Sequence, residues 1–248
     1  MKTIAHNKTM YIIGLGALSL ALLTSCAASK HVEKPTSIPA GQEIEVRPDE
    51  GRTAEFVESK GEKKNCYASW YGREFHGKPT ASGENFNMFA LTCAHRDYAL
   101  GTKLRVSNPA NGREVECIVN DRGPFAGGRD IDLSYAAAKK IGLIGPGVAM
   151  VEIEPLGRYT RYVKDVKYGR LDGQIITIQI GSFREEANAR RLKKGLDLHY
   201  QGIYIMQATI GSDNYYRVRI GKFSNSSDAA QLAKALAQEG YSVLITKY

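Results

Sequence analysis

The stretch Gln179-Ile180-Gly181-Ser182-Phe183 indicates the fold of the last third of the chain. A similar stretch, Arg219-Ile220-Gly221-Lys222-Phe223, occurs forty residues later. The same offset aligns Ala189 with Ala229, so the similarity continues into the segments that follow. A fixed period of this kind indicates a structural unit that occurs twice. Each unit has the pattern of a strand, a turn and a helix.

The order of elements in this region follows from what surrounds the two units. Apolar residues recur at i, i+3 and i+7 in both helical segments, as in amphipathic helices. Ser182 and Glu185 form a capping-box pattern before the first helix. Further strands are predicted over residues 204–210 and 241–246. The sequence therefore predicts a β-α-β-β-α-β order, a small ferredoxin-like α+β domain over residues 172–248.

The middle of the chain, residues 65–156, is expected to be mainly β. Short alternating runs at residues 103–106 and 115–120 flank the pair Asn111-Gly112, which is typical of a hairpin turn. One short helix is predicted over residues 134–140. This pattern predicts a small β-barrel, joined to the last domain by a linker over residues 157–171.

The chain begins with the pattern of an export signal over residues 1–25. Its apolar run, residues 10–23, is shorter than the ~20 residues that span a bilayer. Leu23-Thr24-Ser25-Cys26 resembles a bacterial lipobox, so we expect cleavage before Cys26 and acylation of its thiol. An ordinary signal peptide is the alternative. Residues 26–64 mix prolines and charges and are expected to form a flexible tether.

The net charge of +8 and the pI near 9.2 favour acidic partners, such as nucleic acid, anionic lipid or a cell-wall polymer that carries carboxylates. Export argues against nucleic acid. It also permits a disulfide, but the sequence leaves three pairings open among Cys66, Cys93 and Cys117. No cofactor or metal is expected, although a metal site made of His76, His95 and Asp121 is an alternative.

Three polar or glycine-rich turns carry Glu84, His95 and Asp121. Two carboxylates and an imidazole are groups that bond cleavage by proton transfer requires. Asp121 follows a predicted strand and is our candidate for the acid that later acts as base. Since a useful acid needs a raised pKa, we expect the Arg122 side chain to point away, for example towards Asp130.

Two sets of residues are candidates for contact with a sugar chain. Tyr71 is the aromatic residue that we expect to be exposed beside the catalytic candidates, with core packing as the alternative. In the last domain, strand alternation places Gln179, Tyr215 and Arg217 on the sheet face away from the helices. That face can hydrogen-bond and stack on sugars; a merely solvated face is the alternative.

Five motifs, in order, closely resemble the rare lipoprotein A family. They are Ala68-Ser69-Trp70-Tyr71-Gly72, Phe75-His76-Gly77, Thr80-Ala81-Ser82-Gly83-Glu84, Asn120-Asp121-Arg122-Gly123-Pro124-Phe125 and Asp132-Leu133-Ser134. The resemblance implies a lipobox, a double-psi β-barrel and a C-terminal SPOR domain. It also implies that Glu84, His95 and Asp121 occupy active-site positions, and that the glycan site of the SPOR domain includes Ser182 and Leu244.

The activity that the resemblance implies is that of an endolytic, septal lytic transglycosylase of peptidoglycan, which leaves 1,6-anhydro ends. Its SPOR domain would bind glycan strands stripped of their stem peptides. A non-catalytic scaffold that only holds the wall is the alternative. We expect the protein to be anchored in the inner leaflet of the outer membrane, to face the periplasm, to gather at the septum and to meet divisome proteins there.

Overall fold

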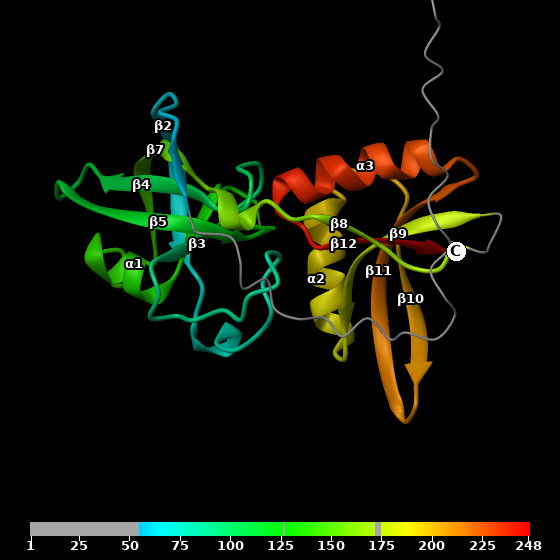
Figure 1. Cartoon of the computed structure of the whole chain (residues 1–248). Helices are drawn as coiled ribbons and strands as arrows, with labels where there is room; N and C mark the ends of the chain where they lie inside the picture. Colours follow the sequence, from blue (N-terminus) through cyan, green and yellow to red (C-terminus); the bar gives the residue numbers. More distant parts are fainter. Residues whose placement is uncertain (1–54, 126, 172–174) are drawn as a thin grey trace, which may run out of the picture. The chain divides into compact units, whose positions relative to one another are not determined.

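The computed structural model describes residues 55–125, 127–171 and 175–248 (Figure 1). They contain a β-barrel followed by a β-α-β-β-α-β domain, as the sequence predicts, and they belong to one compact unit. The predicted signal, Cys26 and most of the predicted tether lie outside the described residues. In the described part of the chain, no helix has both the length and the apolar character to cross a membrane.

Six strands close the barrel in the order β7-β2-β6-β3-β5-β4, because β4 also pairs with β7. Their bounds are β2 Lys64–Trp70, β3 Thr92–His95, β4 Thr102–Asn108, β5 Arg113–Asp121, β6 Ile131–Leu133 and β7 Val148–Tyr159. The pairs β2–β6 and β3–β5 are parallel. Parallel pairing brings the ends of β3 and β5, at His95 and Asp121, to the same edge.

Burial alternates along the barrel strands, which explains why these residues form them. In β4 every second residue is buried, and Leu104 and Val106 point into the core. The helix α1, Tyr135–Lys140, is capped by Ser134, whose hydroxyl accepts from the backbone N–H of Ala137 at 3.2 Å. Two 3-10 turns, η1 (Arg73–Phe75) and η2 (Thr160–Tyr162), lie in the connecting segments.

A short additional strand extends the barrel sheet. β1, Phe56–Glu58, pairs antiparallel with the end of β7, Gly157 to Tyr159. The interpretation of residues 26–64 as a flexible tether is therefore wrong for this strand. Since β1 is only three residues long and has no buried residue, it leaves no pattern of alternating hydrophobic residues in the sequence.

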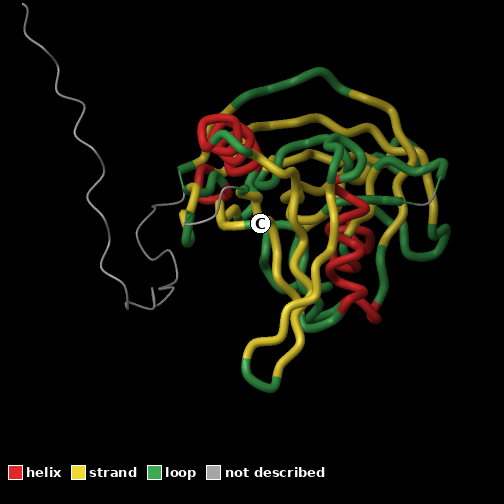
Figure 2. Tube along the Cα trace, turned by 90° about the vertical axis from the view of Figure 1, so that its right-hand side faces the viewer, coloured by secondary structure: helices red, strands yellow, loops and turns green. Residues whose placement is uncertain are grey.

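The terminal domain has a five-stranded sheet in the order β10-β11-β9-β12-β8 (Figures 1 and 2). Its elements are β8 Val166–Tyr168, β9 Ile176–Phe183, α2 Glu186–Leu196, β10 Ile203–Ile210, β11 Asp213–Phe223, α3 Ser226–Glu239 and β12 Val243–Lys247. β8 pairs parallel with β12 and lies in the predicted linker, so that segment is partly a strand. The hairpin of β10 and β11 projects from the sheet in both views.

The predicted capping box of the first terminal helix is wrong. Ser182 lies inside β9, and α2 begins after Glu185, whose side chain makes no cap hydrogen bond. In contrast, the Asn225 side chain caps α3 by accepting from the backbone N–H of Ser227 at 2.8 Å. The strand that contains Ser182 therefore runs further than its sequence pattern indicates.

Candidate active site

A tight turn between Thr80 and Glu84 forms one wall of the site. The N–H and the hydroxyl of Thr80 both donate to the Glu84 carbonyl, at 2.8 and 2.9 Å. Gly83 has a φ of 88°, a left-handed conformation that glycine adopts without steric cost. The N–H of Ser82 donates to the Asn120 carbonyl at 3.1 Å, which ties the turn to the end of β5.

Asp121, the last residue of β5, keeps only 8 % of its surface exposed. Its Oδ1 accepts from the backbone N–H groups of Ala81 at 2.9 Å and Arg122 at 2.8 Å. Burial raises the pKa of the Asp121 carboxyl, against these two hydrogen bonds and the charges of Arg191 and Arg122. The proton-bearing form is thus more accessible than in an exposed aspartate.

The Glu84 carboxylate has a different environment. The Tyr162 hydroxyl faces Oε1 at 3.0 Å and Oε2 at 3.1 Å, and Oε2 also accepts from Asn120 Nδ2 at 3.1 Å and Ser82 Oγ at 3.3 Å. Three donors suit an ionised carboxylate, which only accepts. Because Asn120 precedes Asp121, the end of β5 holds both carboxyl groups around the same turn.

His95 lies at the end of β3, beside β5, and is 7 % exposed. Its Nδ1 accepts from the backbone N–H groups of Asp97 at 3.0 Å and Tyr98 at 3.3 Å, which assigns the ring proton to Nε2. Burial lowers the pKa of His95 to about 4, so the ring is neutral at pH 7. Among the described residues, no hydrogen bond or ion pair joins His95 to Glu84 or Asp121.

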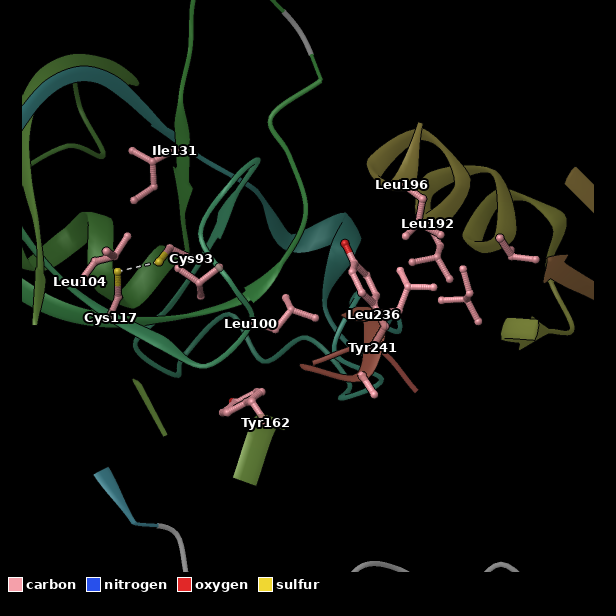
Figure 3. Packing of buried hydrophobic residues seen from close by; sticks show 14 of the residues in the cluster. Cys93, Leu100, Leu104, Cys117, Ile131, Tyr162, Leu192, Leu196, Leu236 and Tyr241 are labelled. Carbon is pink, nitrogen blue, oxygen red and sulfur yellow. Dashed lines mark hydrogen bonds between the residues drawn. The ribbon is translucent and has the colours of Figure 1, made fainter. Parts of the chain in front are cut away.

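The Arg122 side chain points away from the neighbouring carboxyl, as expected. Its Nε donates to the Tyr241 hydroxyl at 2.7 Å, and its Nη1 donates to the Tyr98 carbonyl at 2.9 Å. The suggested partner Asp130 is wrong, since that residue pairs with Arg96 at 2.7 Å. Tyr241 belongs to the buried cluster that also includes Leu100, Tyr162 and Leu236 (Figure 3).

Side chains of the terminal domain contribute to the surroundings of Asp121. Phe183, Asn188, Arg191 and Leu192 line, together with Asp121, a cavity of only about 10 Å³. That volume holds one water at most. A sugar ring therefore does not fit beside the carboxyl in this arrangement.

A larger groove adjoins this small cavity and has a volume of about 380 Å³. One wall is the turn from Thr80 to Gly83, and the other includes Ser182, Glu185 and Asn188. Ser182 is one of the residues that we expected to contact glycan. The groove thus connects a predicted binding residue with the turn that carries Glu84.

Tyr71 is not the exposed aromatic residue that the sequence suggested. Its ring lies 4.2 Å from that of Phe86 and 6.0 Å from that of Phe75, between ring centres, and its hydroxyl oxygen is buried. Burial, reinforced by the charge of Asp121, raises the pKa of Tyr71 well above its usual range. A role of Tyr71 in sugar contact stays a prediction. Phe89, whose ring contacts those of His76 and Tyr135, is an exposed aromatic residue of the barrel at 67 %.

The predicted glycan residues of the terminal domain share the outer sheet face. Arg217 on β11 lies opposite Ser182 on β9, and Gln179 lies opposite Leu244 on β12. Tyr215, two residues before Arg217, points to the same side. Ser182 and Gln179 share this face because the pairing of β9 with β11 shifts by one residue between them. Strand pairing also brings together Gln179 and Leu244, which are 65 positions apart in the chain.

Sequence reasoning missed the residues that hold the carboxylates. Asn120 and Ser82 stand inside the motifs and were within reach, whereas Tyr162 lies 78 positions from Glu84 and gives no local signal. Asp132, which we had not placed in the site, accepts from the Ser69 hydroxyl at 2.6 Å, and burial raises the pKa of its carboxyl.

The alternative metal site is not assembled. His76 is exposed, and its Nδ1 accepts from the backbone N–H of Met88 at 3.2 Å. Within the described ranges, no group of three or more histidine, cysteine, aspartate or glutamate side chains has a metal-binding arrangement.

Comparison with known families gives two matches along the chain. Residues 63–153 match the double-psi barrel family described as "Lytic transglycolase", and residues 172–247 match the SPOR domain. These two segments coincide with the barrel and the terminal domain.

Individual proteins are similar over most of the chain. An endolytic peptidoglycan transglycosylase RlpA of Vibrio cholerae is 31 % identical over 209 residues, which are 84 % of this chain and 77 % of that protein. The RlpA of Campylobacter jejuni is 36 % identical over 203 residues, 74 % of this chain and 72 % of that protein. Among solved structures, the Streptomyces papain inhibitor has a TM-score of 0.33 at 23 % identity and covers 39 % of this chain and 96 % of its own.

Proposed function

Since the chain belongs to the RlpA family of endolytic peptidoglycan transglycosylases, we propose that it cleaves peptidoglycan glycan strands with Asp121 as the catalytic acid and leaves 1,6-anhydro ends. The observation that carries this proposal is the contrast between two carboxyl groups on one turn. Asp121 is buried with backbone donors only, and Glu84 faces three side-chain donors. Of the two, Asp121 is the carboxyl group whose pKa burial raises, so we assign the role of the acid to it.

In the proposed reaction, Asp121 donates its proton to the leaving glycosidic oxygen while positive charge develops on the ring carbon. The 6-hydroxyl of the same sugar attacks that carbon, and the Asp121 carboxylate takes the hydroxyl proton. Asp121 is thus protonated again at the end of the reaction, and water takes no part. The negative charge of Glu84 stabilises the developing cation.

His95 has a supporting role in this proposal. With the ring proton on Nε2 and two backbone donors on Nδ1, the neutral imidazole donates rather than accepts at its free nitrogen. We assign to it a hydrogen bond to a sugar oxygen. Acid catalysis by His95 is disfavoured, because burial lowers its pKa to about 4.

Substrate entry requires the terminal domain to move. A cavity of about 10 Å³ at Asp121 leaves no room for a sugar, and Arg191 and Leu192 of α2 are among the residues that line it. A glycan strand reaches the carboxyl once α2 withdraws. The groove of about 380 Å³ beside Ser182 offers a path for the strand.

The terminal domain is proposed to bind glycan stripped of stem peptides through Gln179, Ser182, Tyr215 and Arg217. Acylation of Cys26 would anchor the chain in the inner leaflet of the outer membrane. Binding to such glycan where it accumulates, at the septum and beside divisome proteins, would raise the local concentration of the barrel at its substrate. These points rest on the sequence motifs and on the SPOR match.

The test is digestion of purified, peptide-free glycan strands with the mature chain, followed by mass analysis of the products. Anhydro ends should form with the native protein and with Asp130→Asn, a control in which an exposed pair with Arg96 is lost. Asp121→Asn should form such ends at a rate that is lower by a factor of roughly 10²–10⁴. Reducing ends would indicate hydrolysis instead. Binding of glycan by the native protein without any product would favour the wall-holding scaffold.

A further inference from the structure

The two sulfur atoms of Cys93 and Cys117 lie 2.8 Å apart inside the barrel (Figure 3). Non-bonded heavy atoms prefer separations of roughly 3.5–4.0 Å, whereas a covalent S–S bond is about 2.05 Å long. The pair is therefore much closer than ordinary packing requires. Both cysteines are buried, at 0 % and 1 % exposure, among apolar neighbours.

Strand pairing explains why these two side chains meet. Cys93 on β3 lies opposite Val119 on β5, so Cys117 is two residues away along the neighbouring strand and shares the same face. Leu133 lies opposite Cys93, and Leu104 lies opposite Cys117. No polar group is opposite either thiol in this register, so the arrangement favours a covalent link over a polar role.

We infer that Cys93 and Cys117 form a disulfide in the exported protein and that Cys66 keeps its thiol. This selects one of the three pairings that the sequence leaves open. Cys66 is only half-buried, and the groups that act on its thiol are the charged side chains of Asp130 and Lys64. The inference uses the export signal that the proposed function also uses, but it does not depend on cleavage activity.

The bond forms by thiol–disulfide exchange. One of the two thiolates attacks an external disulfide, such as a protein disulfide or oxidised glutathione, and forms a mixed disulfide. The second cysteine then displaces the external thiol. In total, two thiols lose two protons and two electrons, and one external disulfide is reduced to two thiols. Since burial raises the pKa of Cys93 and shields both sulfurs, exchange takes place before the barrel closes.

A disulfide here joins the two strands that carry His95 and Asp121. Cys93 lies two residues before His95 on β3, and Cys117 lies four residues before Asp121 on β5. A bond between them fixes the two strands that carry these groups. The positions are 24 residues apart, so the link also restricts the unfolded chain.

The test is to refold the mature chain with oxidised glutathione, block free thiols with iodoacetamide, digest it without reduction and identify the linked peptides by mass. We expect one linked pair, Cys93 with Cys117, and alkylated Cys66. The Cys66→Ser variant should give the same linked pair. Alkylation of all three cysteines, or a link that includes Cys66, would overturn the inference.

A stability measurement provides an independent readout. Reductant present during refolding should lower the thermal midpoint of the native chain by on the order of 10 °C. A double variant, Cys93→Ala with Cys117→Val, keeps the site apolar and should be insensitive to the reductant. A native midpoint that does not change with reductant would contradict the disulfide, and this comparison does not require the variant to fold.

Discussion

The barrel and the terminal domain both carry polar residues that we propose to contact a sugar polymer, and apart from the exposed Glu84 those of the barrel are the more buried. Asp121 and His95 of the barrel are 8 % and 7 % exposed, whereas Ser182 is exposed and Arg217 half-buried on the terminal sheet. Burial shifts the pKa values of the two barrel groups in opposite directions. A proton donor gains from burial that raises its pKa, while a long polymer needs a face that it can reach.

The largest expected effect tests whether catalysis belongs to the barrel and glycan binding to the terminal domain. Asp121→Asn should lower the rate constant of cleavage by roughly 10²–10⁴-fold, because it removes the proton donor. Glycan affinity should stay close to that of the native chain. Arg217→Ala should weaken glycan binding and leave the rate at saturating substrate nearly unchanged. Cleavage rates and binding isotherms of both variants check this.

Two outcomes would show that catalysis and glycan recognition are not divided between the two domains. Loss of binding with Asp121→Asn would place recognition in the barrel. A large fall in the saturated rate with Arg217→Ala would give the terminal face a part in the chemistry.

The pH dependence of the unfolding free energy tests the burial of His95. The pKa of His95 falls from 6.5 to about 4 on folding, so the neutral ring contributes stability above pH 6.5 that is lost as the pH falls through about 4. Compared with His95→Asn, the native chain should lose about 3 kcal/mol of unfolding free energy between pH 7 and pH 4. Denaturant unfolding at several pH values measures this. A difference between the two proteins that does not vary with pH would contradict it.

The terminal domain could be predicted well because its information is local. The repeat at residues 179–183 and 219–223, with two amphipathic segments, is enough for the β-α-β-β-α-β order. Arg219 shows where alternation falls short. Alternation with Arg217 predicts an outward side chain for it, but the residue is only 4 % exposed, and a register shift beside it interrupts the regular pairing.

The barrel depends more on distant partners, and prediction from sequence was weaker there. β4 and β5 show alternation, but β1 is held by its pairing with β7, about a hundred positions away. The same applies to the site. The motifs predict Glu84 and Asp121 as site residues, whereas the contact between Glu84 and Tyr162 joins positions 78 residues apart and leaves no local pattern.

A glycine beside Tyr162 provides the third test. Gly101 has a φ of 90°, and a Cβ there would lie 2.5 Å from the Tyr162 ring. Gly101→Ala should therefore lower the free energy of unfolding by about 2–4 kcal/mol, from left-handed strain and overpacking together. Gly112→Ala is the matched control, since φ is 67° and nothing lies within 4 Å of the added carbon. It should cost only about 1–2 kcal/mol. Equal losses would show that the Tyr162 contact is not tight.

The smallest expected effect concerns the hydroxyl that joins Glu84 to the barrel. Tyr162→Phe keeps the buried ring but removes a donor 3.0 Å from Oε1. Because Asn120 and Ser82 still donate to Oε2, we expect a loss of only about 1–2 kcal/mol in unfolding free energy. Cleavage should slow by on the order of tenfold, since the carboxylate becomes less well oriented.

Tyr159→Phe separates this effect from the general loss of a tyrosine hydroxyl. Tyr159 lies on β7, packs against the Phe56 ring at 5.0 Å between centres, and is not among the donors to Glu84. Its variant should cleave at the native rate. If both variants slow cleavage equally, orientation of Glu84 by Tyr162 is not the cause. If only Tyr162→Phe slows cleavage, the hydroxyl of the buried Tyr162 orients Glu84, the more exposed of the two carboxyl groups.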